Sequence, residues 1–280
     1  MNDRGRWAIR LTAAALLGLL AWWVSRPQAD TFTSFEGEAF ATHVRITYRG
    51  PVDKVEVFRA VDAELDRIDA MASTWQDDSE LMRYNRADDP GAFELSSELA
   101  GLIDRAKQIE AQTGGAFALR PDGVSIDLSA IAKGYAVDRV VELLQSEFGV
   151  TAGLVDIGGE VRAFGDGPKG DGWRVGLYEP QDMPDLPGIA APTLQLRDIS
   201  VATSGDYFKG SHILDPATGE PVVNDLVSAS VIHSKGAAAD ALATALYVMG
   251  HEHGLAWAED NDVHAIFLLK DGRRLEHQPE

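Results

Sequence analysis

The chain has no cysteine among its 280 residues. This absence excludes disulfides, thiolate catalysis, iron–sulfur clusters, thiolate zinc sites and a lipid-modified N-terminal cysteine. Basic residues are also scarce, because 25 Lys and Arg face 44 Asp and Glu, for a net charge of −19. This balance argues against a nucleic-acid partner. Solubility accounts for most of the acidic excess, and a bound divalent cation would also fit it.

The chain has no uncharged run near its N-terminus that is long enough for a comfortable membrane span. An arginine-rich start is followed by the uncharged stretch Leu11–Val24, which suits the hydrophobic region of a signal peptide. Cleavage after Ala29 would place Pro27 at position −3, which is a poor site. Both a cleaved signal and an uncleaved signal-anchor therefore stay open. We expect residues 1–29 to be this targeting segment and residues 30–280 to be one exported domain on the periplasmic side of the inner membrane.

Strand and helix patterns mix along the chain without a regular βαβ rhythm, so we expect an α+β fold with mixed or antiparallel sheets flanked by helices. The pattern predicts helices over 52–71, 97–113, 129–148, 238–250 and 252–259. It predicts strands over 31–48 (strongest over 41–48), 153–165, 173–178, 193–205, 228–234 and 264–270, and a short strand that ends at Asp127. The proline-rich segment 180–192 is expected to be a loop.

Two polar residues lie inside the alanine-rich helix 238–250. Asp240 and Thr244 are four residues apart, so they share one helix face. Asp240 could be a helix N-cap, and Thr244 could bond to the carbonyl one turn earlier. Alternatively, the pair could supply hard oxygen ligands to Mg²⁺. Spacing alone leaves both interpretations open.

A lysine lies in the first turn of the helix 129–148. Lys133 there opposes the helix dipole, so a negative group should compensate it: Asp127, Asp138 or a ligand phosphate. Phosphate binding is reasonable at this point, because a helix start offers unpaired N–H groups.

Three further polar clusters fall where elements begin or end. Gly158 and Gly159 in DIGGE indicate either a bulge or close approach of a ligand. Residues 203–205, Thr-Ser-Gly, follow a strand and could be a ligand contact or an ordinary turn. His212 precedes a turn sequence that contains Asp215.

The order of these motifs is similar to that of one family. DLSAIAKGYAVD, DIGGE, ATSGDY, HILDPATG and ADALATAL follow one another as in the FAD:protein FMN transferases, the ApbE family. GEAFATH and MASTWQDDSELMRYN resemble its N-terminal motifs, and the resemblance covers about residues 35–270. It implies the family fold, with a ligand cleft between the sheets and helices.

The resemblance assigns roles to individual residues. It implies that Asp240, Thr244 and the backbone carbonyl of Ala130 bind Mg²⁺. It implies FAD contacts at Phe40, Trp75, Ala116, Phe117, Ala118 and Asp127. It further places Lys133 near the FAD pyrophosphate, and it implies close backbone and hydroxyl contacts from Gly158, Gly159, Thr203, Ser204 and Gly205. His212 matches a motif histidine and is the expected base, with Asp215 a weaker candidate.

The implied reaction moves FMN from FAD to a Thr or Ser hydroxyl of an exported acceptor flavoprotein, with release of AMP. Two motifs depart from the family, which usually has Met-Gly-Thr at Phe40-Ala41-Thr42 and Phe-Asp-Pro at Phe117-Ala118-Leu119. Two alternatives therefore stand beside the transferase. One is an FAD pyrophosphatase that gives FMN and AMP, and the other is a non-catalytic flavin-binding module. The N-terminal segment, if uncleaved, would add the membrane as a partner.

Overall fold

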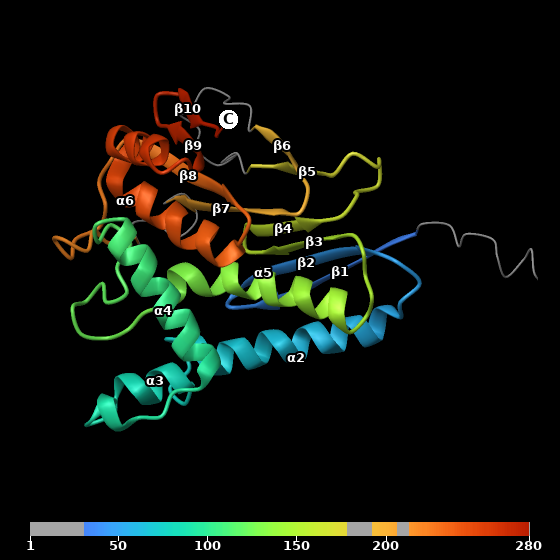
Figure 1. Ribbon diagram of the computed structural model, residues 1–280, viewed down its shortest axis with the longest axis horizontal. Helices are drawn as coiled ribbons and strands as arrows, with labels where there is room; N and C mark the ends of the chain where they lie inside the picture. Colours follow the sequence, from blue (N-terminus) through green and yellow to red (C-terminus); the bar gives the residue numbers. More distant parts are fainter. Residues whose placement is uncertain (1–30, 178–191, 206–212, 280) are drawn as a thin grey trace, which may run out of the picture.

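Figure 1 shows the computed structural model, which describes residues 31–177, 192–205 and 213–279. Its main sheet has eight strands in the order β1-β2-β3-β4-β7-β8-β9-β10, and every neighbouring pair is antiparallel. These strands are β1 Phe32–Ala39, β2 Thr42–Arg49, β3 Gly153–Ile157, β4 Glu160–Phe164, β7 Ile199–Gly205, β8 Leu226–His233, β9 His264–Leu269 and β10 Arg274–His277. A second sheet pairs β5 Trp173–Gly176 with β6 Thr193–Leu196. The predicted α+β class is confirmed.

Helices cover one face of the main sheet and the small sheet covers the other. The helices are α2 Lys54–Ala72, α3 Glu80–Asn85, α4 Ser97–Gln112, α5 Ser129–Ser146 and α6 Gly236–Asp260, with a 3₁₀ turn η1 at Pro90–Ala92. One hydrophobic cluster joins α2 and α5 to β1, β2 and β3, and another joins α4 and α6 to β7, β8 and β9. Alternate residues of the same strands pack on the opposite face with β5 and β6. Consequently α5 and α6 lie against the sheet and against each other (Figure 1).

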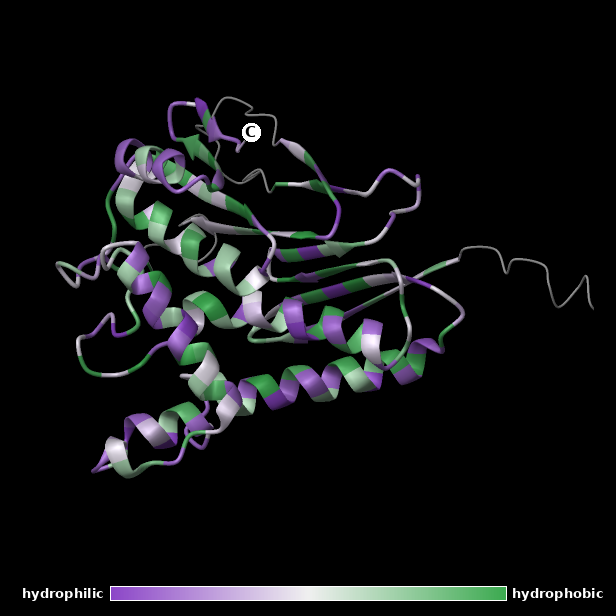
Figure 2. Cartoon of the chain, viewed as in Figure 1, coloured by the Kyte–Doolittle hydropathy of each residue, from purple (hydrophilic) through white to green (hydrophobic). Residues whose placement is uncertain are grey.

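The predicted helices agree with the structure to within a few residues at their ends. Hydrophobic and hydrophilic residues alternate along α2 in Figure 2, as expected of an amphipathic helix on a sheet. The apolar side of α2 includes Val57, which is buried, whereas its neighbour Phe58 is 37 % exposed. The Phe58 ring packs edge-on against Phe35 at the rim of the core. The expected pair of C-terminal helices is confirmed as two parts of α6, which kinks at Gly250.

Two regions predicted as single strands are hairpins. The strand predicted over 31–48 divides into β1 and β2, which are joined by a turn at Phe40 and Ala41. The strand predicted over 153–165 divides into β3 and β4, joined by Gly158 and Gly159. The bulge interpretation of these glycines is therefore wrong. All four turn residues have positive φ, as the favoured two-residue hairpin turns require.

The short strand predicted to end at Asp127 is absent, because the segment between α4 and α5 consists of turns and extended backbone. The side chain of Asn85 replaces a strand partner: its amide donates to Ile126 O at 2.8 Å, and its oxygen accepts from Ile126 N at 3.0 Å. A side chain far along the sequence thus satisfies the backbone that a strand pattern would have paired. The proline-rich segment 180–192 lies almost entirely outside the described residues.

The turn between β1 and β2 contains a strained residue that can be tested. Ala41 is exposed and has a φ of 55°, a conformation that costs a residue with a Cβ roughly 1 kcal/mol. We expect Ala41→Gly to raise the free energy of unfolding by about 1 kcal/mol, measured by urea denaturation. The control, Ala63→Gly on the exposed side of α2, should lower it by about 1 kcal/mol. A destabilised Ala41→Gly protein would show that the turn is not strained.

Candidate functional site

The centre of the candidate site is the carboxylate of Asp240, which is buried in the middle of a helix. Asp240 is only 3 % exposed, and its Oδ2 accepts a hydrogen bond from the backbone N–H of Gly134 at 2.9 Å. The helix α6 begins four residues earlier, at Gly236, so the N-cap interpretation of Asp240 is wrong. The carboxylate instead joins α6 to the start of α5, and its Oδ1 faces Lys133.

The two helices approach very closely at this point because both carry glycine. A Cβ added to Gly134 would lie 2.2 Å from the carbonyl oxygen of Gly236 and 2.6 Å from the Cβ of Asp240. The start of α6 is fixed by Asp138, whose carboxylate accepts from the N–H groups of Gly236 and Ala237. The position of Asp240 relative to α5 is therefore set by backbone contacts rather than by flexible side chains.

Lys133 is compensated by residues that the sequence did not indicate. Its Nζ lies 2.7 Å from Glu160 Oε1 and 3.8 Å from Asp240 Oδ1. The prediction that Asp127 or Asp138 compensates Lys133 was wrong. Asp127 accepts from Ser129 N at the start of α5, and Asp138 holds α6 and pairs with Arg162 at 2.9 Å.

Two acidic side chains thus surround one ammonium in a buried setting. Burial alone would lower the pKa of Lys133, but the charges of Asp240 and Glu160 outweigh it and raise that pKa, so the ammonium stays protonated at neutral pH. Burial raises the pKa of the Glu160 carboxyl, although the nearby ammonium opposes this change. Glu160 is 3 % exposed, and its Oε2 is buried without a hydrogen-bond partner among the described residues. The group is therefore rich in acceptor oxygens and can accept a further cation.

The hydroxyl of Thr244 lies one turn along α6 from Asp240 and meets the end of β7. Its Oγ1 is 3.0 Å from Ser204 Oγ, so the structure gives it a partner other than the helix carbonyl one turn earlier. Thr203 Oγ1 lies 2.8 Å from Ser230 Oγ on β8, and Gly205 ends β7. The structure therefore brings Ser204 to the face of α6 that carries Thr244.

The two glycines of DIGGE connect this group to the first hairpin. Gly158 N donates to His43 O at 3.0 Å, and a Cβ at Gly158 would lie 2.7 Å from the side chain of Thr42. The turn containing Phe40 and the turn preceding Glu160 therefore lie side by side. Both turns belong to the predicted site.

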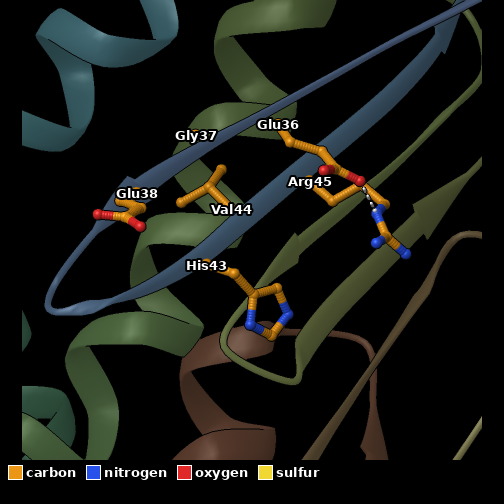
Figure 3. A pocket seen from close by; sticks show the side chains of 6 residues that line it. All are labelled: Glu36, Gly37, Glu38, His43, Val44 and Arg45. Atoms are coloured by element: carbon orange, nitrogen blue, oxygen red, sulfur yellow. Dashed lines mark hydrogen bonds and ion pairs between the residues drawn. The ribbon is translucent and has the colours of Figure 1, made fainter.

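A shallow hollow lies beside these turns, on the first hairpin. It is lined by Glu36, Gly37, Glu38, His43, Val44 and Arg45, and Figure 3 shows the His43 ring and the ion-paired Glu36 and Arg45 at its wall. Asp156 of β3 lies 3.6 Å from His43. None of the predicted site residues lines this hollow, so it is a neighbour of the site rather than its centre.

The predicted flavin contacts lie in different surroundings. Trp75 follows α2 and is 91 % exposed, so its ring is open to a ligand but does not belong to the buried Asp240 group. The Phe117 ring is 1 % exposed within the core, which leaves its backbone for contact, whereas Ala116 and Ala118 are half-buried. Ala130 is half-buried in the first turn of α5.

His212 lies outside the described residues. Asp215 is a turn residue, as expected: its Oδ1 accepts from Ala217 N and its carbonyl accepts from Gly219 N. Across 31–177, 192–205 and 213–279 no cluster of three or more His, Asp or Glu side chains forms a metal site. Within the same ranges no helix has the length and apolar character to cross a membrane.

Glu160 is the functional candidate that sequence reasoning missed. It ends the DIGGE motif, in which only the two glycines were weighed as candidates. Glu160 begins β4, in which Val161, Ala163 and Phe164 are apolar, and this apolar run directly after the glycine turn is the signal that could have found it.

Comparisons with known proteins show the family of the chain. A model of the ApbE family matches residues 40–120 and 118–267. The chain is 31 % identical to the FAD:protein FMN transferase of Vibrio cholerae serotype O1 over 93 % of each chain. It is 25 % identical to that of Escherichia coli strain K12 over 94 % of each chain.

Solved structures give the same result. The flavin transferase ApbE from Vibrio cholerae superposes with a TM-score of 0.77 at 28 % identity, over 90 % of this chain and 98 % of that one. The apo form of Pseudomonas stutzeri flavinyl transferase ApbE gives 0.78 at 28 %, over 90 % and 95 %. The chain therefore belongs to the ApbE family, and these full-length relatives are FAD:protein FMN transferases.

Proposed function

We propose that this chain, an FAD:protein FMN transferase by kinship, works with Mg²⁺ held by Asp240, Thr244 and the backbone carbonyl of Ala130. The observation that carries the proposal is the buried Asp240 carboxylate between α5 and α6, with a hydroxyl one turn away. The available donors are all oxygens, which Mg²⁺ prefers. The Lys133 ammonium is hydrogen-bonded to Glu160 and lies 3.8 Å from Asp240 Oδ1, so it does not bind that oxygen directly.

When bound, Mg²⁺ would neutralise charge on the FAD diphosphate. The residues of the chain do the rest by positioning. Lys133 supplies a fixed positive charge at the start of α5. The end of β7 at Thr203, Ser204 and Gly205 supplies hydroxyls for phosphate oxygens, and the turn at Gly158 and Gly159 lets the ligand approach the backbone closely. Phe40, Trp75, Ala116, Phe117, Ala118 and Asp127 remain the proposed contacts to FAD.

The acceptor's Thr or Ser hydroxyl attacks the phosphorus on the FMN side of FAD, and AMP leaves as the bond between the two phosphates breaks. A base must take the hydroxyl proton, and we assign this role to His212. The segment that contains His212 joins the end of β7 to the Asp215 turn, which supports this assignment.

A direct assay tests the function. The full-length chain in mild detergent is incubated with FAD, Mg²⁺ and an acceptor domain carrying a flavinylation threonine, and the acceptor is weighed by mass spectrometry. We expect a gain equal to one FMN group. Bound FAD without any gain would favour a flavin-binding module, and rapid AMP release without acceptor would favour a pyrophosphatase.

The role of His212 is tested in the same assay. His212→Gln should slow FMN transfer about 10²-fold, because the hydroxyl proton loses its acceptor, while leaving FAD affinity nearly unchanged. The matched control is His253→Gln, an exposed histidine on α6, which should transfer FMN at the normal rate. A loss smaller than about threefold for His212→Gln would remove His212 from the mechanism.

The location of the protein is part of the same proposal. The arginine-rich start and the uncharged Leu11–Val24 support export to the periplasmic side of the inner membrane, either anchored or released. An exported acceptor flavoprotein would be found in the same compartment.

A further inference from the structure

We propose that Glu160 is a positioning residue that holds the Lys133 ammonium away from Asp240 and so keeps Asp240 available to the metal. The inference rests on the proposed function, because it concerns the same metal site. It assigns a role in metal affinity to a residue that does not itself bind the metal.

The Lys133 ammonium lies at different distances from its two acidic neighbours. Its Nζ lies 2.7 Å from Glu160 Oε1, a direct hydrogen-bonded ion pair, but 3.8 Å from Asp240 Oδ1. The ammonium is thus bound to one carboxylate and only close to the other. A lysine side chain is flexible, so Lys133 can move the remaining distance if its partner is removed.

Asp240 has one carboxylate oxygen that already accepts a hydrogen bond. Its Oδ2 accepts from Gly134 N at 2.9 Å, so Oδ1 is the oxygen that faces Lys133. An ammonium bound directly to Oδ1 would occupy the position of a cation and neutralise the carboxylate. Mg²⁺ would then have to displace a buried ion pair before it could bind.

The packing of α5 against α6 is rigid around Lys133 and Asp240. Gly134 leaves no room for a Cβ against Gly236 and Asp240, so α5 and α6 are in close contact at this point. This contact fixes the distance between the backbones that carry Lys133 and Asp240. Glu160 reaches Lys133 from the sheet, directly after the turn at Gly158 and Gly159. It is 3 % exposed, and its Oε2 has no partner among the described residues. A buried carboxylate that makes one strong contact and lacks a second is costly for stability, which is consistent with a functional role.

The experiment measures Mn²⁺ binding to the full-length chain by electron paramagnetic resonance of the free ion, with and without FAD. Mn²⁺ stands in for Mg²⁺ because both prefer oxygen ligands. Glu160→Gln, which keeps the shape of the side chain, should raise the Kd for Mn²⁺ at least about tenfold. Glu160→Asp keeps the charge but is one methylene shorter, so its Kd should fall between those of the wild type and Glu160→Gln.

The decisive variant is the double replacement Glu160→Gln with Lys133→Met. It removes the ammonium that would otherwise cover Asp240, so the Kd should return to within about threefold of the wild-type value. A residue that merely supports the fold would give no such rescue. Glu142→Gln, in an exposed pair with Arg139 on α5, is the matched control and should bind Mn²⁺ normally.

Two results would overturn this inference alone: normal Mn²⁺ affinity in Glu160→Gln, or a double variant that binds no better than Glu160→Gln. A different result would overturn the metal site itself and this inference with it. That result is a wild-type chain that does not bind Mn²⁺, or an Asp240→Asn chain that binds it as tightly as the wild type.

Discussion

Asp240→Asn should slow FMN transfer at least about 10³-fold and abolish Mn²⁺ binding, the largest functional loss expected from one replacement on α6. The amide oxygen can still accept from Gly134 N, so the contact between α5 and α6 is kept. What is lost is the negative charge that a divalent cation requires. A 10³-fold loss corresponds to about 4 kcal/mol of transition-state stabilisation, a reasonable value for the loss of a metal.

Mass spectrometry of the acceptor gives the rate of transfer, and a thermal melt of the variant separates function from folding. Asp104→Asn is the matched control, because Asp104 is exposed on α4 and pairs with Lys107 on the same helix. It should transfer FMN normally. If Asp240→Asn transferred FMN within about tenfold of the wild-type rate, the metal site would have to lie elsewhere.

The face of α6 that carries Asp240 and Thr244 was predictable because its signal is local. Four-residue spacing in an otherwise apolar helix specifies the face, and the ordered motifs specify the family. The structure adds the contacts of each residue. Gly134 N and Ser204 Oγ, the partners of Asp240 and Thr244, come from other elements, and the start of α6 at Gly236 excludes the N-cap.

The partner of Lys133 could not be predicted for the same reason. Asp127 and Asp138 were the acidic residues nearest in sequence, whereas Glu160 comes from a strand and reaches α5 only in the folded chain. Local sequence favours local partners, but a helix packed on a sheet meets residues from distant segments. Asp138 shows the reverse case. It lies on α5, but its carboxylate accepts from the backbone N–H groups of Gly236 and Ala237 at the start of α6.

Hairpins were missed where alternation continued through a turn. Phe40 and Ala41 are not typical turn residues, so the composition gives no sign of the break between β1 and β2. Both residues nevertheless adopt the positive φ that the turn requires. Gly158 and Gly159 do have turn chemistry, but a strand pattern on both sides also fits a bulge. In the segment before α5, the side chain of Asn85 provides the bonds that a strand would have made, and its position could not be read from spacing.

Gly134→Ala should be the most destabilising single-methyl replacement in α5. The added Cβ would lie 2.2 Å from the carbonyl oxygen of Gly236, an atom that cannot move without shifting the start of α6. Overpacking of this kind costs about 1–3 kcal/mol, or more when backbone must move. Alanine regains about 1 kcal/mol of helix propensity, so we expect a net loss of about 2 kcal/mol in the free energy of unfolding.

Urea denaturation measures this loss, and Gly101→Ala is the matched control. Gly101 lies on the exposed side of α4, where a Cβ meets nothing within 4 Å, so the same replacement should stabilise the protein by about 1 kcal/mol. The folded Gly134→Ala protein should also bind Mn²⁺ more weakly, because α5 carries Ala130 and Lys133 while α6 carries Asp240. If Gly134→Ala matched Gly101→Ala in stability, the close contact of the two helices would be wrong. If it were destabilised but bound Mn²⁺ normally, the spacing of α5 and α6 would matter for folding and not for the metal.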